Sequence, residues 1–360
     1  MFDKRDTKRA KGIAILLLVF HHLFYNLARV QDSGMIFHLN SYKYVQIAAV
    51  MARICVWVFV FLSAYGLSCQ YELCKNEQTD LQFVVKRWIS MMSGYWFAYI
   101  VIFALYAIIV GNPLKVYGGQ PQHMILDIFG WADFCHTPLL LGVWWYMCLA
   151  QILIIMIPLL NFLCGKFGMN IMIVLFICFQ YLPKGIVSSS GGSYLMYLPV
   201  AVLAVICAKF NLLNKIKIID YSQINRGVLL KAFCRYCAII MAMILKYNFQ
   251  PYDKWMVTPF ISALITFLIV VCVCDFTNKK NIKLLELLGE HSGNIFMIHA
   301  FFYMYCKKVI YCTHNPIISY CIIIGICLGV SIIMEFIKKR IHYQEIFNNL
   351  NKKIESSIDC

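Results

Sequence analysis

Long apolar runs follow one another along almost the whole chain, and short polar connections separate them. A helix needs roughly 20 apolar residues to cross the hydrocarbon core of a bilayer. About ten segments meet that requirement: residues 10–29, 44–69, 84–110, 138–163, 168–183, 193–212, 228–247, 254–275, 293–312 and 316–337. The pattern therefore predicts an all-α membrane protein with about ten transmembrane helices.

The segments are not divided by a linker or by an internal repeat. We therefore expect one multi-pass membrane domain over residues 1–340 and a short cytoplasmic tail over residues 341–360. The first apolar run ends in HHLFYNLARV, which lacks the small residues of a signal-peptide cleavage site. The N-terminal segment is therefore expected to be an uncleaved first span.

Positive charge is distributed unevenly along the chain. The sequence has 32 lysines and arginines against 17 acidic residues. Most of these cations fall on one side of the membrane if ten spans alternate and the N-terminus is inside. Lysine and arginine accumulate in cytoplasmic loops, so both termini are predicted to be cytoplasmic in the cell membrane. The charge then reflects topology and contact with anionic lipid, and it requires no nucleic-acid partner.

Composition narrows the class of protein further. Hydrophobic residues make up 61% of the chain and charged residues 14%, with a mean hydropathy of +0.72. These values exclude a soluble binding module and leave the lipid bilayer as the main partner. Most of the 17 cysteines lie inside apolar runs, where cysteine acts as a small apolar side chain. Because Cys272 and Cys274 have no ligands at zinc spacing, no metal site is predicted.

The first span carries a lysine and two histidines in KGIAILLLVFHH. Lys11 and His22 are eleven residues apart, which on a helix means about 20° in azimuth and about 16 Å in height. His22 would then lie near mid-bilayer on the same face as Lys11. One interpretation is that His21 and His22 only bridge helices through hydrogen bonds. The other is that His22 faces a polar cavity and transfers protons there.

The same stretch resembles the opening of the acyltransferase-3 family of multi-pass membrane O-acyltransferases. That family begins with a basic residue, usually arginine, followed by ten residues and a histidine. Lys11 stands at the basic position here and His22 at the histidine. Lysine keeps the charge but lacks the planar fork that binds carboxylate or phosphate through two hydrogen bonds.

Four later segments resemble the family in the same order. They are ICVWVFVFLSAYGLS with Ser63, VVKRWISMMSGYW with Arg87, LGVWWYMCLAQ with Trp144 and Trp145, and LLGEHSGNIFMIHAFF with Ser292 and His299. Ala64, Ser90 and Gly94 depart from the family pattern. The resemblance extends from residue 9 to about residue 303.

The resemblance implies a chemistry. Members of the family transfer acyl groups, usually acetyl, from a cytoplasmic thioester such as acetyl-CoA to hydroxyls of cell-surface carbohydrates or lipid-linked glycans. It implies that His22 is catalytic, that acetyl-CoA is a co-substrate, and that no cofactor is tightly bound. His22 would serve either as a general base or as a carrier of the acyl group.

Depth along the helices adds further candidates. Arg53 is expected about 13 Å below the outer surface, near the level of His22. It would bind a substrate anion or an oxyanion there, unless it forms an internal ion pair or extends to the outer surface. Lys11, Ser63 and Arg87 converge in depth on the cytoplasmic mouth, which suits donor phosphates. The positive-inside rule alone also explains Arg87.

Aromatic and late polar residues complete the candidate site. Trp144 and Trp145 lie near the outer end of a predicted span, where they form either an interfacial belt or a platform for a sugar. Ser292 and His299 share a helix face and are candidates for supporting the donor or substrate. A helix-packing role for His299 is an equal alternative.

A rival function stays open at this point. Intramembrane histidine and arginine also mark transport paths, so the alternative is a transporter or flippase that exports a glycan or small-molecule intermediate. A receptor or structural subunit is a third reading. The sequence does not reveal the acceptor or whether the chain forms a homo-oligomer.

Overall fold

The computed structural model describes residues 2–37, 41–181, 194–216, 219, 225–249, 257–277 and 282–358, and within them every regular element is helical. The first half contains α1 (Lys4–Phe24), α2 (Leu27–Asp32), α3 (Ser41–Ala52), α4 (Ile54–Cys74), α5 (Asp80–Ile109), α6 (Pro121–Ile128), α7 (Trp145–Tyr181) and α8 (Leu198–Lys209). The second half contains α9 (Leu212–Lys215), α10 (Arg226–Phe249), α11 (Val257–Thr277), α12 (Lys283–Glu290), α13 (Ser292–Tyr305), α14 (Lys307–Ile310), α15 (Pro316–Arg340) and α16 (Tyr343–Ile358). Three 3₁₀ turns complete the described part of the chain: η1 (Pro113–Tyr117), η2 (Gly142–Trp144) and η3 (Tyr194–Tyr197).

Six helical stretches of the described chain are long and apolar enough to cross a bilayer. They are Tyr42–Cys74, Asp80–Ile109, Gly142–Phe179, Arg226–Asn248, Pro259–Thr277 and Pro316–Arg340. The shorter apolar stretch Tyr194–Lys209 corresponds to the expected span 193–212. Residues 182–183, 193 and 254–256 of the expected spans lie outside the described residues.

The expected count of ten is not confirmed: 10–29, 193–212 and 293–312 are not among these six stretches, and 138–163 and 168–183 fall in one of them. The expected helix 10–29 ends at Phe24, because Asn26 caps a new short helix by accepting a hydrogen bond from the Arg29 amide. The expected helix 293–312 ends at Tyr305 and is followed by the separate α14. The expected helices 138–163 and 168–183 are joined in α7 but separated by a kink at Gly168, whose φ of 71° is not helical.

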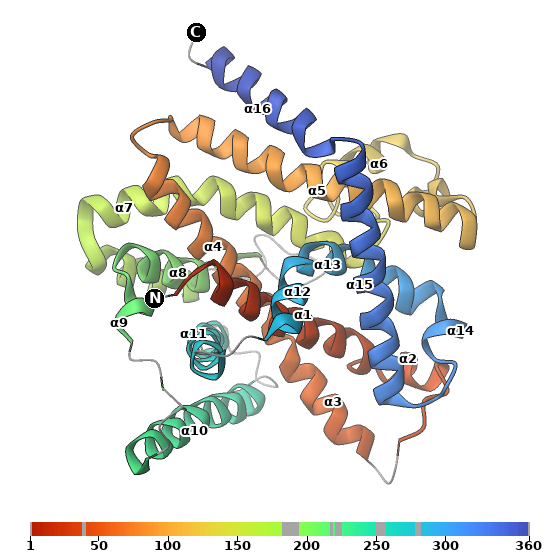
Figure 1. Cartoon of the computed structure of the whole chain (residues 1–360), viewed down its shortest axis with the longest axis horizontal. Coiled ribbons are helices and arrows are strands. Elements are labelled where there is room, and N and C mark those ends of the chain that lie inside the picture. The colour runs from red at the N-terminus through yellow and green to blue at the C-terminus, as the bar shows by residue number, and fades with distance from the viewer. Residues whose placement is uncertain are drawn as a thin grey trace.

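Helix α1 lies at the centre of the molecule (Figure 1). Its residues Ala10 and Ala14 belong to a buried apolar cluster with α4, α7, α8 and α11. Its residues Ile15, Leu18 and Leu23 belong to a second cluster with α5, α13 and α15. One helix thus packs on both groups, so its last turn lies deep inside the bundle.

Helix α1 approaches α12 so closely that only glycine fits at the contact. A Cβ atom on Gly289 would lie 1.7 Å from the Lys8 carbonyl oxygen, and one on Gly12 would lie 2.3 Å from the Leu285 carbonyl oxygen. Small residues allow such approaches between helices in membranes, where dispersion contacts replace the hydrophobic driving force. An ion pair of 2.7 Å between Arg9 and Glu286 fixes the same contact.

The start of α1 and the end of α15 meet the same junction between α12 and α13. Lys8 pairs with Glu290 at 2.9 Å, and Asn294 donates to Glu335 at 2.8 Å. These two helix ends therefore lie at one end of the bundle. Helix α16 extends from that end away from the bundle and carries the C-terminus (Figure 1). The cytoplasmic position of both termini stays a prediction.

Candidate active site

Polar contacts position the start of α1, and its two histidines lie in its last turn. The Asp3 carboxylate accepts hydrogen bonds from the Arg5 and Asp6 amides, which satisfies backbone donors of the first turn. Eleven residues beyond Lys11, His22 lies in the last turn of α1 next to His21. His22 as a whole residue is half-buried.

Aromatic and imidazole rings surround His22. Its ring centre lies 5.0 Å from that of His21 and 5.1 Å from that of His299 on α13. The Tyr303 ring stacks on His22 at 5.9 Å with an interplanar angle of 15°. The fold therefore brings together His22 and His299, two candidate residues that are far apart in the sequence.

His299 is fully buried, and its two ring nitrogens have different environments. Nδ1 lies 2.8 Å from the Phe296 carbonyl oxygen and 3.2 Å from that of Ile295. Nε2 is buried and has no hydrogen-bond partner among the described residues. A buried polar atom without a partner is costly, so this nitrogen marks a place where a further group is needed.

Arg29 and Tyr303 are site residues that the sequence reasoning missed. The Arg29 guanidinium donates to the backbone carbonyl of His22 and lies 4.3 Å from the centre of the Tyr303 ring. Arg29 follows the apolar run and falls in α2, so it resembled a scattered loop cation. The sequence contains no signal for this role, because the cation–aromatic pairing depends on the turn after Phe24.

Arg53 lies at the break between α3 and α4, where the Arg53 and Val56 amides donate to carbonyls three residues earlier at 3.2 Å. The side chain is exposed, and its charge acts on both His21 and His22. Its guanidinium is within hydrogen-bonding reach of the Tyr197 hydroxyl. Arg53 thus adds a positive charge to the environment of the histidine pair.

Lys246 is a second cation near Arg53 and was not predicted. It lies on α10, and its ammonium group is 5.8 Å from the centre of the Trp57 ring on α4. The charge of Arg53 also acts on Lys246. The sequence did not indicate a role for Lys246 in the site, because a lysine in the last turn of a helix commonly interacts with the helix dipole.

The two tryptophans occupy different environments. Trp144 is 1% exposed, donates to the Met297 carbonyl oxygen at 3.0 Å, and packs against Tyr95 with ring centres 5.2 Å apart. It joins η2 to α13 and so supports the helix of His299. Trp145 is half-buried and stacks on Tyr197 at 5.8 Å, which connects it to Arg53. Trp145 is therefore the more exposed of the two rings.

The predicted donor-binding residues are only partly enclosed. Lys11 is half-buried, with no hydrogen bond or ion pair to any described residue. Ser63 is half-buried beside the Tyr146 hydroxyl. The Arg87 guanidinium lies 5.5 Å from the Phe83 ring centre, and its buried Nε has no partner in the described part of the chain.

Ser292 is held by the backbone. Its hydroxyl donates to the Gly289 carbonyl oxygen at 2.8 Å at the start of α13. It is seven residues before His299, which on a helix means about 10 Å along the axis. Ser292 therefore fixes the junction of α12 and α13 and does not contact the histidine rings directly.

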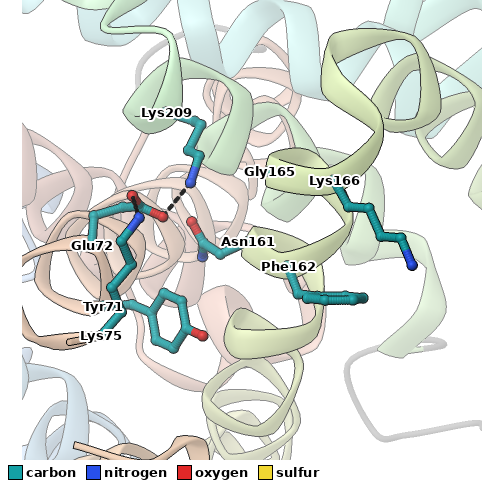
Figure 2. A pocket seen from close by; sticks show the side chains of 8 residues that line it. All are labelled: Tyr71, Glu72, Lys75, Asn161, Phe162, Gly165, Lys166 and Lys209. Atoms are coloured by element: carbon teal, nitrogen blue, oxygen red, sulfur yellow. Dashed lines mark hydrogen bonds and ion pairs between the residues drawn. The ribbon is translucent and has the colours of Figure 1, made fainter. Parts of the chain in front are cut away.

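A cavity of about 280 Å³ lies away from the histidines, between α4, α7 and α8 (Figure 2). Figure 2 shows the Glu72 carboxylate between the ammonium groups of Lys75 and Lys209, with the Lys75 bond at 2.8 Å. Asn161 faces the same space, whereas Lys166 extends to one side toward the Phe162 ring. Glu72 offsets one of the three lysine charges, so the lining of this cavity keeps a net positive charge.

Comparison with known proteins gives one match. Residues 9–336 match a family model described as an acyltransferase domain. No curated protein and no solved structure matches the chain. The matched range includes all of the candidate residues above.

Proposed function

Because the chain belongs to the acyltransferase-3 family, we propose that it is a membrane O-acetyltransferase. It moves an acetyl group from acetyl-CoA or a related acyl donor to a hydroxyl of a cell-surface carbohydrate or a lipid-linked glycan. The observation that carries the proposal is the meeting of His22 with His299, Arg29 and Arg53 inside a membrane protein. Ionisable groups are kept at such a depth mainly for function.

His22 performs the proton transfer. A sugar hydroxyl is a weak nucleophile, so a base must take its proton as the oxygen attacks the thioester carbonyl. The neutral His22 ring accepts that proton, the carbon–sulfur bond breaks, and the protonated ring returns the proton to the thiolate. Alternatively, His22 attacks first and carries the acetyl group as an acyl-imidazole. The second route suits donor and acceptor on opposite faces of the membrane.

Cations assist both routes. The tetrahedral intermediate carries a negative oxygen, and the exposed guanidinium of Arg53 beside the histidines is suited to stabilise it. Lys11 is suited to bind donor phosphates, as is the Nε of Arg87, which has no hydrogen-bond partner in the part of the chain that the structure describes. Trp145 offers a ring for the acceptor next to Tyr197.

Labelled acetyl-CoA tests the function. Membranes containing the protein are given the labelled donor, and glycan and lipid fractions are analysed for label. His22→Ala should lower transfer by about 10²–10⁴-fold, the usual contribution of a general base. His342→Ala is the matched control, because His342 is exposed on the tail and its side chain bonds only Glu345 among the described residues. Uptake of an intermediate without transfer of label would instead favour a transporter.

Donor binding is tested separately. Lys11→Ala should raise the KM for acetyl-CoA and leave kcat nearly unchanged, because Lys11 lies far from the reacting atoms on α1. Lys307→Ala, an exposed lysine outside the site, is the control. An unchanged KM would remove Lys11 from the donor site without affecting the role of His22.

A further inference from the structure

We propose that the cavity between α4, α7 and α8 binds the headgroup of an anionic phospholipid, whose acyl chains then lie along the exposed face of α7. Three features of the cavity support this binding: its charge, its space and the apolar surface beside it. The lipid site is separate from the histidines, and its existence does not depend on acetyl transfer.

Three ammonium groups and one carboxylate line the cavity, so its net charge is positive. Lys75 donates to the Glu72 carboxylate at 2.8 Å, and Lys209 donates to the same carboxylate (Figure 2). An ammonium group has three hydrogens, so both lysines keep donors after these bonds. Lys166 has no hydrogen bond or ion pair with a residue that the structure describes, and its ammonium group lies 5.6 Å from the centre of the Phe162 ring. These charges and spare donors suit the oxygens of a phosphate group.

The cavity has room for a phosphate because Gly165 leaves one wall without a side chain. A Cβ atom at Gly165 would lie 3.7 Å from the Lys209 ammonium nitrogen. Asn161 faces the same space (Figure 2). Its amide nitrogen donates one hydrogen to the Ile157 carbonyl oxygen at 2.9 Å and has a second hydrogen to donate. The volume of about 280 Å³ is near the lower limit of small-ligand pockets, about 300 Å³. It suits a phosphate with a small polar headgroup and is too small to enclose a nucleotide.

An apolar face of α7 leads away from the cavity. Ile155, Leu159 and Phe162 are each more than half exposed. They are four and three residues apart, so they share one face of the helix, and Lys166 continues that face four residues later. The helix therefore presents apolar side chains followed by a cation. A phospholipid has the matching order of acyl chains and anionic headgroup, whereas a soluble phosphate would use only the cationic end.

The cavity lies at the end of the bundle that holds the N-terminus. The Phe2 ring packs against Tyr65 with ring centres 5.2 Å apart, and Tyr65 is about two turns before Glu72 on α4. The Phe2 amide also donates to the side chain of Asn214, which follows the Lys209 end of α8. This end is predicted to be cytoplasmic. The cytoplasmic leaflet carries anionic lipids, and basic pockets between helices on that side bind their headgroups.

Native mass spectrometry of the purified full-length protein in detergent tests the lipid site without an acyltransferase assay. Phosphatidylglycerol is titrated as the anionic lipid, and phosphatidylcholine with the same chains is the lipid without net charge. Phosphatidylglycerol should bind more tightly. Lys166→Gln should weaken its binding about fivefold, the usual contribution of one lysine near anionic lipid. The substitution should leave the fold intact, because Lys166 bonds no residue in the described part of the chain.

Two further variants sharpen the test. Lys283→Gln is the matched control, because Lys283 is exposed at the start of α12, at the same end of the bundle but outside the cavity. It should leave phosphatidylglycerol binding unchanged. Glu72→Gln removes the carboxylate from the cavity and should strengthen binding, an effect opposite in sign to that of Lys166→Gln.

Three results would overturn the proposal. Equal affinity for the two lipids would show that only the apolar face of α7 binds. Equal weakening by Lys166→Gln and Lys283→Gln would show attraction to the positive end of the bundle as a whole. Displacement of phosphatidylglycerol by inorganic phosphate or acetyl-CoA would assign the cavity to a soluble phosphate ligand. A protein that transfers no acetyl label would refute the proposed function and leave the lipid measurement valid.

Discussion

At the residue scale, two glycines determine how closely the central helix can pack. Gly289→Ala would place a methyl group 1.7 Å from the Lys8 carbonyl oxygen, and backbone cannot move aside as a side chain can. We expect a loss of about 2–4 kcal/mol in the free energy of unfolding, typical of overpacking at a rigid contact. Thermal unfolding of the purified protein in detergent measures this loss. Gly293→Ala is the control, because nothing lies within 4 Å of its Cβ position; equal melting temperatures for both variants would contradict the prediction.

The single residues also show how far a sequence can define a site. Helix periodicity and depth single out His22 and Arg53, and in the structure the charge of Arg53 acts on His22. Arg29 and Lys246 were not predicted, because both look like ordinary charges at the ends of apolar runs. Their roles depend on a turn after Phe24 and on the packing of α10 near α4, which are tertiary features. Nε2 of His299, which has no hydrogen-bond partner among the described residues, likewise depends on a rotamer that no sequence pattern encodes.

At the element scale, the connection between α5 and α7 is fastened by a buried carboxylate. Asp127 on α6 accepts hydrogen bonds from the Tyr117 hydroxyl at 2.7 Å and the Leu140 amide at 2.8 Å. Burial raises the pKa of Asp127 from 3.8 to about 6, although these donors oppose the shift. Between about pH 4 and pH 6, Asp127 is therefore protonated in the folded protein and ionised in the unfolded chain. Stability from this group should rise as pH falls through 6, by roughly 3 kcal/mol at most.

Hydrogen exchange over residues 113–144 measures this dependence. Protection of the segment should be greater at pH 5 than at pH 7.5 in the wild type. Asp127→Asn, which mimics the protonated side chain, should reduce the difference between the two pH values. Asp127→Ala should lower protection at both values, because the buried Tyr117 hydroxyl and Leu140 amide lose their acceptor. An equal pH response in the wild type and Asp127→Asn would show that another group controls it.

The observed helix boundaries show which span ends can be predicted from the pattern of apolar residues and which cannot. The expected span 84–110 coincides with α5 as far as Ile109, and the kink at Gly168 follows directly after the expected gap between 163 and 168. The break between α3 and α4 at Arg53 could not be predicted, because apolar residues continue on both sides of it. The end of α1 at Phe24 was also hidden, since hydropathy does not register a cap such as Asn26.

At the scale of the whole molecule, the remaining prediction concerns which end of the bundle faces the cytoplasm. The start of α1 and the end of α15 share the α12–α13 junction, so both termini should report the same side. The lysines and arginines at that end predict the cytoplasm. Fluorescent protein fused after residue 360 should therefore be fluorescent, and alkaline phosphatase fused after Lys115 should be active outside the cell membrane. The reverse result for both fusions would place Lys11 on the outer face, where it could not bind a cytoplasmic thioester. His22 would then need an external donor, so the topology determines whether acetyl-CoA can be the co-substrate at all.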